Sequence, residues 1–195
     1  ILKVDIIPRF SMNTSFADIE KKENRKDLII SICVFLSGFS CFAQLYYFQP
    51  LLPDLAKDFI LSASESSFAI SFSTLGMVFG LFTTMFVADR IPRKKMIGTG
   101  LLSSSIFSVA ASFSPTFLPL ILLSAAKGFL LSGATSVSMA YIAEEVSSRN
   151  KGKIMGLYIA GNALGGMAGR VISSWIGALY TWRIASVSIG LICAL

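Results

Sequence analysis

Histidine is absent from this 195-residue chain, and only 14% of its residues are charged. A soluble domain carries about 25% charged residues. Without histidine the chain can build neither a histidine-ligated metal site nor a Ser-His-Asp triad, which removes two common kinds of enzyme site. The three cysteines, Cys33, Cys41 and Cys193, lie in apolar stretches without metal-ligand spacing, so we interpret them as small apolar residues. We expect no metal and no cofactor.

Long apolar stretches separate the few clusters of charge. The first five are close to the roughly 20 residues that cross a bilayer as a helix, and none of the stretches alternates with the period of two that a membrane barrel requires. The sequence therefore predicts an all-α membrane protein with a six-helix transmembrane bundle. The expected spans are 28–49, 67–87, 96–113, 117–140, 154–176 and an incomplete 184–195.

Residues 1–27 precede the first apolar stretch and are expected to form a cytoplasmic N-terminal segment, while residues 28–195 form the bundle. The segment lacks a secretory cleavage site followed by a soluble chain, so the first span is a retained anchor. Met12 is a candidate native start, which makes residues 1–11 candidates for a non-native extension.

Lysine and arginine are distributed unequally between alternate connections. Segments 1–27, 88–95 and 141–153 hold thirteen of them, whereas the other side holds only Lys57 and Arg183. This positive-inside bias predicts a cytoplasmic amino terminus. It also explains the net charge of +6 without a nucleic-acid partner.

Two ionisable residues, Lys127 and Arg170, lie inside expected spans, and no acid does. Charges within a membrane are costly and mark function or pairing. Lys127 lies near the middle of its span on a polar strip, for which we favour a water-accessible cavity over a lipid-facing or purely packed position. For Arg170, a snorkelling structural role and a functional role stay equally open. The strip comprises Ser124, Lys127, Gly128, Thr135 and Ser138.

A second polar strip runs along the first span through Ser37, Ser40, Gln44 and Tyr47. These side chains either line a solute path or form hydrogen bonds to neighbouring helices. Glycines gather in spans two, four and five, at spacings that let membrane helices approach closely. Pro50 and Pro53 predict that the first helix ends before a short helical continuation.

The connection after span two, residues 88–95, resembles the loop signature G-x-L-x-D-R-x-G-R-R/K of the major facilitator superfamily. Asp89, Arg90, Arg93 and Lys94 match, while Met85 and Pro92 replace the glycines. Proline fixes φ where glycine would permit positive values, so the turn must differ.

Span five resembles the glycine-rich antiporter signature G-x8-G-x3-G-P-x2-G of that superfamily. Gly156, Gly165 and Gly169 match, while Arg170 replaces the proline and Ser173 the last glycine. Leu51–Thr74 and Gly156–Arg183 also look like arabinose-efflux-permease-like transporters of the bacterial inner membrane.

The resemblance implies the N-terminal half of a twelve-span transporter, built as two inverted three-helix repeats, in a bacterial inner membrane. It implies efflux of a small drug- or sugar-like solute by proton antiport, with the bilayer, the solute, protons and a C-terminal six-helix half as partners. Gln44, Tyr47, Lys127 and Asn162 would bind the solute. The gating and motif residues would be Asp89, Arg90, Arg93, Lys94, Gly156, Gly165, Gly169 and Arg170.

Two other classes stay open at this point. The chain could be a non-transporting orphan half or truncated product that acts only by assembling with another membrane subunit. A membrane enzyme is disfavoured because histidine and embedded carboxylates are missing, so we expect no enzymatic activity.

Overall fold

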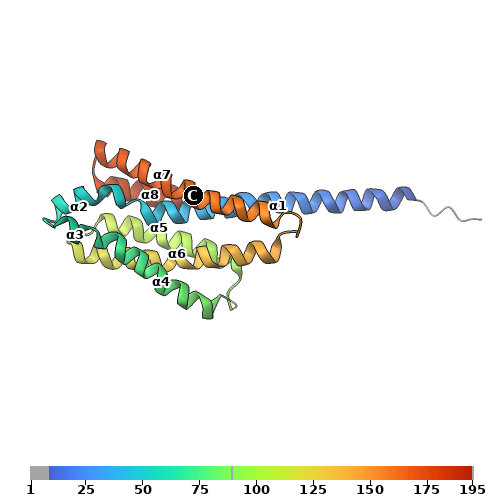
Figure 1. Cartoon of the computed structure of the whole chain (residues 1–195), viewed down its shortest axis with the longest axis horizontal. Helices are drawn as coiled ribbons and strands as arrows, with labels where there is room; N and C mark the ends of the chain where they lie inside the picture. Colours follow the sequence, from blue (N-terminus) through green and yellow to red (C-terminus); the bar gives the residue numbers. More distant parts are fainter. Residues whose placement is uncertain (1–8, 89, 195) are drawn as a thin grey trace, which may run out of the picture.

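A computed structural model describes residues 9–88 and 90–194, with side chains from residue 21 onward. These residues form helices and their connections, without a β-strand (Figure 1). The helices are α1 (Arg9–Tyr46), the 3-10 helix η1 (Gln49–Leu51), α2 (Leu52–Asp58), α3 (Ala63–Ser66), α4 (Phe68–Val87), α5 (Arg93–Ser112), α6 (Phe117–Glu145), α7 (Lys151–Leu179) and α8 (Trp182–Ala194).

Helices cover all six expected apolar stretches. Three segments are long and apolar enough to cross a membrane: Lys21–Asp58, Ala63–Val87 and Phe117–Glu145. Helices α5 and α7 are as long but less apolar, because serines and a basic first turn dilute α5 and glycines dilute α7. Helix α8 is shorter. The all-helical class is therefore confirmed, with three spans supported by length and composition.

Prolines stand where helices η1, α2 and α5 begin, and the first of them follows the end of α1. Helix α1 stops at Tyr46, and Pro50 and Pro53 each lie in the first turn of the short helix that follows, as expected. Pro92 stands at the N-cap of α5 with φ −55° and ψ 127°. Its ring favours this φ, so proline ends the preceding turn and begins α5 where the family signature has glycine.

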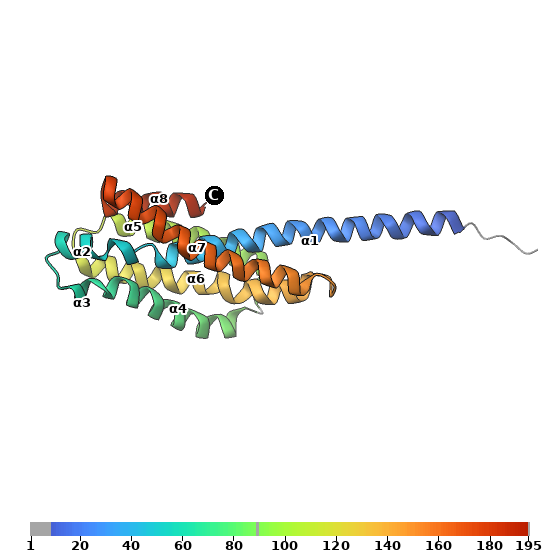
Figure 2. The same ribbon diagram turned by 45° about the horizontal axis from the view of Figure 1, so that its top comes forward.

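Long helices that follow one another in the chain run in opposite directions, so α1 is parallel to α7 and α4 is parallel to α6, and α1 extends beyond the rest of the bundle (Figures 1 and 2). The largest interfaces join α4 to α6, α1 to α7 and α5 to α6, followed by α5 with α8. The extension of α1 and the α4–α5 and α6–α7 connections lie at one end, which we name the basic end; α2, α3 and the start of α8 lie at the other, the Trp182 end.

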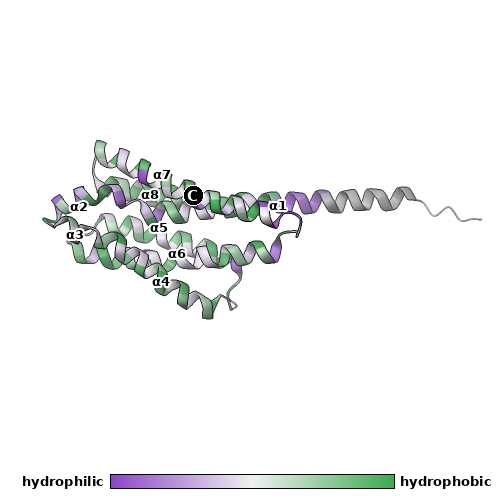
Figure 3. Cartoon of the chain, viewed as in Figure 1, coloured by the Kyte–Doolittle hydropathy of each residue, from purple (hydrophilic) through white to green (hydrophobic). Residues whose placement is uncertain are grey.

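Apolar side chains cover much of the outside as well as the interior (Figure 3). Large exposed examples follow one face of α4, among them Phe79, Phe82 and Phe86, which are 59%, 65% and 77% exposed. In water such a continuous face would be unfavourable, so it is suited to contact lipid or another helix. The hydrophilic residues concentrate on α1 where it leaves the bundle and in the connections.

Candidate functional site

Lys127 lies in the interior of the bundle. Its side chain is 1% exposed, and its Nζ has no hydrogen-bond partner among the described residues. The ammonium sits 4.4 Å from the ring centroid of Tyr47 and 4.8 Å from that of Phe48. These cation–π contacts replace part of the lost hydration. The expected open cavity is not seen around this residue: Lys127 points towards α1, and its neighbours enclose it.

Gln44 and Tyr47 are also fully buried. The Gln44 amide donates to Ser105 Oγ at 3.2 Å and accepts from Ser108 Oγ at 3.3 Å, so it joins α1 to α5. The Tyr47 hydroxyl is buried without a hydrogen bond of standard geometry in the described part of the chain. Of the two interpretations of this strip, Gln44 follows the second, since it bonds to a neighbouring helix.

Arg170 lies on the other side of α1. Its Cζ is 4.7 Å from the ring centroid of Tyr46, and its Nε is buried without a hydrogen-bond partner among the described residues. The side chain as a whole is partly exposed. Asn162 lies two turns earlier in α7, and its Oδ1 is likewise buried and unpartnered in the described chain.

The glycines of α7 differ in what surrounds them. A methyl group on Gly165 or Gly169 would overlap the backbone of α1 at Phe39 and Ala43, and at Gly169 it would come within 2.6 Å of the Ala43 carbonyl oxygen. These two glycines therefore let α7 pack directly on α1. A methyl on Gly156 would meet nothing within 4 Å, so its match to the signature does not reflect packing within this chain.

Helices α4 and α6 make an equally close contact. A methyl on Gly76 would overlap the backbone of Ala125, and one on Gly128 would overlap the backbone of Ser73. Both helices thus contribute a glycine to the interface. The expectation that these glycines serve close helix packing is confirmed here.

At the basic end, α5 and α6 are joined by an ion pair. Arg93 donates from Nε to Glu144 Oε2 at 2.9 Å and from Nη2 to Glu144 Oε1 at 2.6 Å. This bidentate geometry is the favoured arrangement for arginine and carboxylate, and it holds the pKa of Glu144 below its usual range. Lys94 Nζ lies 5.9 Å from the centroid of the Tyr141 ring. Asp89, the acid of the signature, lies outside the described residues.

Asp27 is a site residue that the sequence interpretation missed. It is 4% exposed, and its Oδ2 accepts from Ser147 Oγ at 2.6 Å and Asn150 Nδ2 at 2.8 Å. These two hydrogen bonds lower the pKa of the carboxyl. Asp27 thereby fastens α1 to the α6–α7 connection. The available signal was that this acid directly precedes an apolar stretch.

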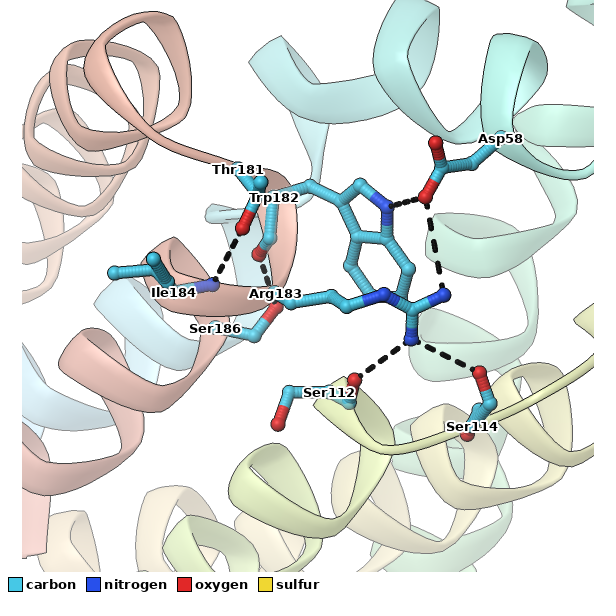
Figure 4. A network of polar contacts seen from close by, with 8 residues as sticks. All are labelled: Asp58, Ser112, Ser114, Thr181, Trp182, Arg183, Ile184 and Ser186. Carbon is cyan, nitrogen blue, oxygen red and sulfur yellow. Dashed lines mark hydrogen bonds and ion pairs between the residues drawn. The ribbon is translucent and has the colours of Figure 1, made fainter.

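The Trp182 end contains a second missed network (Figure 4). Asp58 accepts from Trp182 Nε1 at 2.7 Å, and Arg183 Nη2 lies 3.8 Å from the same carboxylate oxygen. Arg183 Nη1 donates to the carbonyl oxygens of Ser112 and Ser114 at 2.9 and 3.1 Å. Arginine thus satisfies carbonyls at the end of α5 that the helix itself leaves free.

Two of the grooves at the basic end border α1. One, of about 630 Å³, lies between α1, α5 and α6 and combines apolar walls with Lys22, Arg25, Lys26 and Lys94. The other, of about 510 Å³, lies between α1 and α7 and is lined in part by Asp27, Asn150 and Lys153. Neither is lined by Lys127, Gln44 or Tyr47, so the structure separates these grooves from the residues assigned to solute binding.

Comparisons with known proteins agree with these observations. Residues 31–195 match the model of the Major Facilitator Superfamily. The chain is 39% identical over 172 residues to an uncharacterized transporter of Buchnera aphidicola (from Schizaphis graminum), covering 88% of this chain and 42% of that protein. It is 37% identical over 161 residues to the inner membrane transport protein YnfM of Escherichia coli K12, covering 83% and 39%.

A third relative, the uncharacterized MFS-type transporter YybF of Bacillus subtilis, is 33% identical over 163 residues, which cover 84% of this chain and 40% of that protein. The chain therefore spans about 40% of the length of these curated relatives. The family match covers most of the chain and agrees with its helical fold, its long apolar segments and its close glycine contacts. The chain belongs to the major facilitator superfamily of membrane transporters.

Proposed function

We propose that this chain is the N-terminal half of a secondary active transporter that exports a small organic solute in exchange for protons. One observation carries the proposal: the α1–α7 and α4–α6 interfaces are both extensive and both built on glycine. If α1, α4 and α5 form one inverted repeat and α6, α7 and α8 the other, these interfaces are equivalent. Each joins the first helix of one repeat to the second helix of the other.

The glycine spacing supports this equivalence. Gly76 and Gly80 of α4 lie four residues apart against α6, and Gly165 and Gly169 of α7 lie four residues apart against α1. Such contacts make stiff helix pairs that can move as units during alternating access. A second six-helix half would supply the opposing unit around a central solute site.

We place the basic end in the cytoplasm of a bacterium, with the chain in the inner membrane. The extension of α1 and the two basic connections, α4–α5 and α6–α7, lie together at that end, which supports the charge-based orientation (Figure 1). There the Arg93–Glu144 pair, with Asp89, Arg90 and Lys94 nearby in sequence, would form a latch that stabilises one state of the cycle.

Within the bundle, Lys127 with Gln44 and Tyr47 would form the charged centre of the cycle. Lys127 would either attract an anionic group or exchange a proton. Asn162 would contact the solute from α7. Because Lys127 is enclosed in this structure, its participation requires the surrounding helices to separate in another state of the cycle.

The test is transport by the full-length gene product in proteoliposomes with an imposed pH gradient. We expect addition of a transported solute to dissipate the gradient and solute to move against its own concentration. Glu144→Gln should lower turnover several-fold with solute binding unchanged, as should Asp89→Asn. The matched control is Glu65→Gln, which removes the charge from an exposed carboxylate at the Trp182 end, where the glutamine side chain can still accept from Ser62.

Absence of any solute-dependent gradient change, with the protein folded and inserted, would favour an assembly role instead. Orientation is tested in a variant without Cys33, Cys41 and Cys193 that carries one new cysteine. Arg93→Cys should resist membrane-impermeant reagent in intact cells, whereas Lys57→Cys should react. The reverse pattern would overturn the cytoplasmic placement of the basic end.

A further inference from the structure

Arg170 is a charge within an expected span, and no counter-ion pairs with it among the described residues. It lies nine residues before the end of α7, about 14 Å from that end at 1.5 Å per residue. Every acid in the sequence lies outside the expected spans, and none of the described carboxylates pairs with Arg170. Placing an unpaired guanidinium at this depth costs free energy unless a bound anion or water neutralises or solvates it.

The contacts of Arg170 leave one edge available. Tyr46 covers one face of the guanidinium at 4.7 Å, while Nε is turned inward with no described acceptor. Guanidinium presents its N–H groups in the plane of the group, so stacking on the ring does not consume them. The in-plane edge can bind a planar oxyanion through two parallel hydrogen bonds.

The position of Arg170 is fixed by the residues beside it. Gly169 packs on the backbone of Ala43, and Ser173 Oγ donates to the carbonyl oxygen of Tyr47 at 2.8 Å. One residue on each side of this turn thus fastens α7 to α1. A recognition group held by such contacts loses little freedom when a ligand binds, which favours affinity.

Asn162, Gly166 and Arg170 recur every four residues on α7, so they lie on one side of the helix over about 12 Å. The side of Gly166 faces aromatic residues: a methyl there would meet Tyr46 Cδ2 at 3.4 Å and Phe42 Cβ at 4.0 Å. This arrangement offers a cation at one end, an amide at the other and an apolar wall between them.

We propose that Arg170, stacked on Tyr46, binds the carboxylate of an organic anion whose apolar body lies along Phe42 and whose far end reaches Asn162. The proposal rests on the proposed transport function and names its substrate class. It places solute recognition on the partly exposed side of α1, away from enclosed Lys127. A flat carboxylate fits the in-plane edge of the guanidinium, and an apolar body fits the aromatic wall.

Equilibrium binding to the full-length gene product tests this assignment with paired probes: benzoate with benzamide, and phenylacetate with phenylacetamide. We expect at least one carboxylate to bind saturably and its amide at least tenfold more weakly. Arg170→Gln should weaken carboxylate binding at least tenfold, and Arg170→Lys should be intermediate, since lysine keeps the charge without the two-pronged geometry.

The control is Lys57→Gln, which removes an exposed cation of α2 outside the expected spans and should change carboxylate affinity less than threefold. Thermal unfolding of each variant shows whether it is folded. The proposal is overturned if neither carboxylate binds, if folded Arg170→Gln binds as the parent does, or if phenylphosphonate is preferred over both carboxylates. Proton-coupled transport of a neutral solute unaffected by Arg170→Gln would also overturn it, while leaving the proposed function standing.

Discussion

Lys127 and Arg170 are two cations at nearly the same depth, about 15 Å and about 14 Å from the Trp182 end of their helices. They lie against consecutive tyrosines, Arg170 against Tyr46, the last residue of α1, and Lys127 against Tyr47, which directly follows α1. The backbone N–H of Tyr47 still donates to the Ala43 carbonyl oxygen at 3.2 Å, so the two tyrosines point about 100° apart, as consecutive helix residues do, and the two cations occupy different sides of α1. One is enclosed by the bundle, and the other is partly exposed.

The difference separates two roles that a membrane-level cation can have. An enclosed ammonium can respond to its surroundings only when the helices move, whereas an exposed guanidinium edge can meet a solute directly. Both use an aromatic ring as a partial substitute for water. If the comparison holds, changes at Lys127 affect the transport cycle, and changes at Arg170 affect which solute binds.

The largest expected effect comes from Lys127→Met in the full-length protein. We expect transport to be abolished or uncoupled from protons, with insertion and abundance near normal, because methionine fills a similar apolar space without the charge. Lys127→Arg should be partly active. Proteoliposome transport at several pH values measures this, and normal transport with unchanged pH dependence would remove Lys127 from the cycle.

Gly169→Ala tests whether the position of Arg170 depends on the close α1–α7 contact. The added methyl overlaps the Ala43 backbone, so the helices must separate. We expect a destabilisation of about 1–3 kcal/mol, seen as a lower thermal midpoint, together with weaker solute binding. Gly156→Ala is the control and should lower neither quantity, since a methyl there meets open space and alanine favours the helix more than glycine does. Equal effects of the two substitutions would contradict the packing account.

Replacing each tyrosine by leucine compares the two cation–π contacts directly. Tyr47→Leu should affect turnover and Tyr46→Leu solute affinity, each with a loss of about 1–2 kcal/mol, equivalent to roughly five- to thirtyfold. Steady-state transport kinetics separate the two, because the first lowers kcat and the second raises KM. If both variants changed the same parameter, the two sides of α1 would share one function.

Asp27→Asn should have the smallest effect on transport and on solute affinity, because Asp27 lies at the basic end, away from Lys127 and Arg170. We expect a loss of about 1–2 kcal/mol in stability, since the amide accepts more weakly from Ser147 and Asn150. The pKa of Asp27 is lowered in the folded chain, so its stabilisation is complete above the unfolded pKa and is lost as pH falls through the folded pKa. The stability difference between parent and variant should therefore shrink in acid. A difference that grew in acid would contradict this linkage.

The positions of the helices could be predicted from the sequence, because apolar stretches, prolines and glycines act on the chain locally. Pro50, Pro53 and Pro92 stand where helices begin, and Gly76 and Gly165 stand where helices touch. The side to which Lys127 points was not predictable in this way. A polar strip shows that residues share a face, but which neighbour covers that face depends on contacts between distant helices.

The ion pairs and the Asp27 site were missed for the same reason. Asp27 meets Ser147 across 120 positions of sequence, and Arg93 meets Glu144 across 51. Nothing local in the sequence specifies such partners. The solute-binding assignment of Gln44, Tyr47, Lys127 and Asn162 remains a prediction, while the structure adds that Gln44 bonds to α5.

The unequal helix interfaces also mean that the bundle resists some internal movements more than others. Backbones touch within the α1–α7 and α4–α6 pairs, whereas contact between α1 and α4 or between α6 and α7 is slight. Sliding within a pair would force backbone carbonyls past one another, whereas no glycine contact of this kind joins one pair to the other in the described part of the chain. Relative movement of the two pairs would therefore meet less steric resistance than movement within either pair.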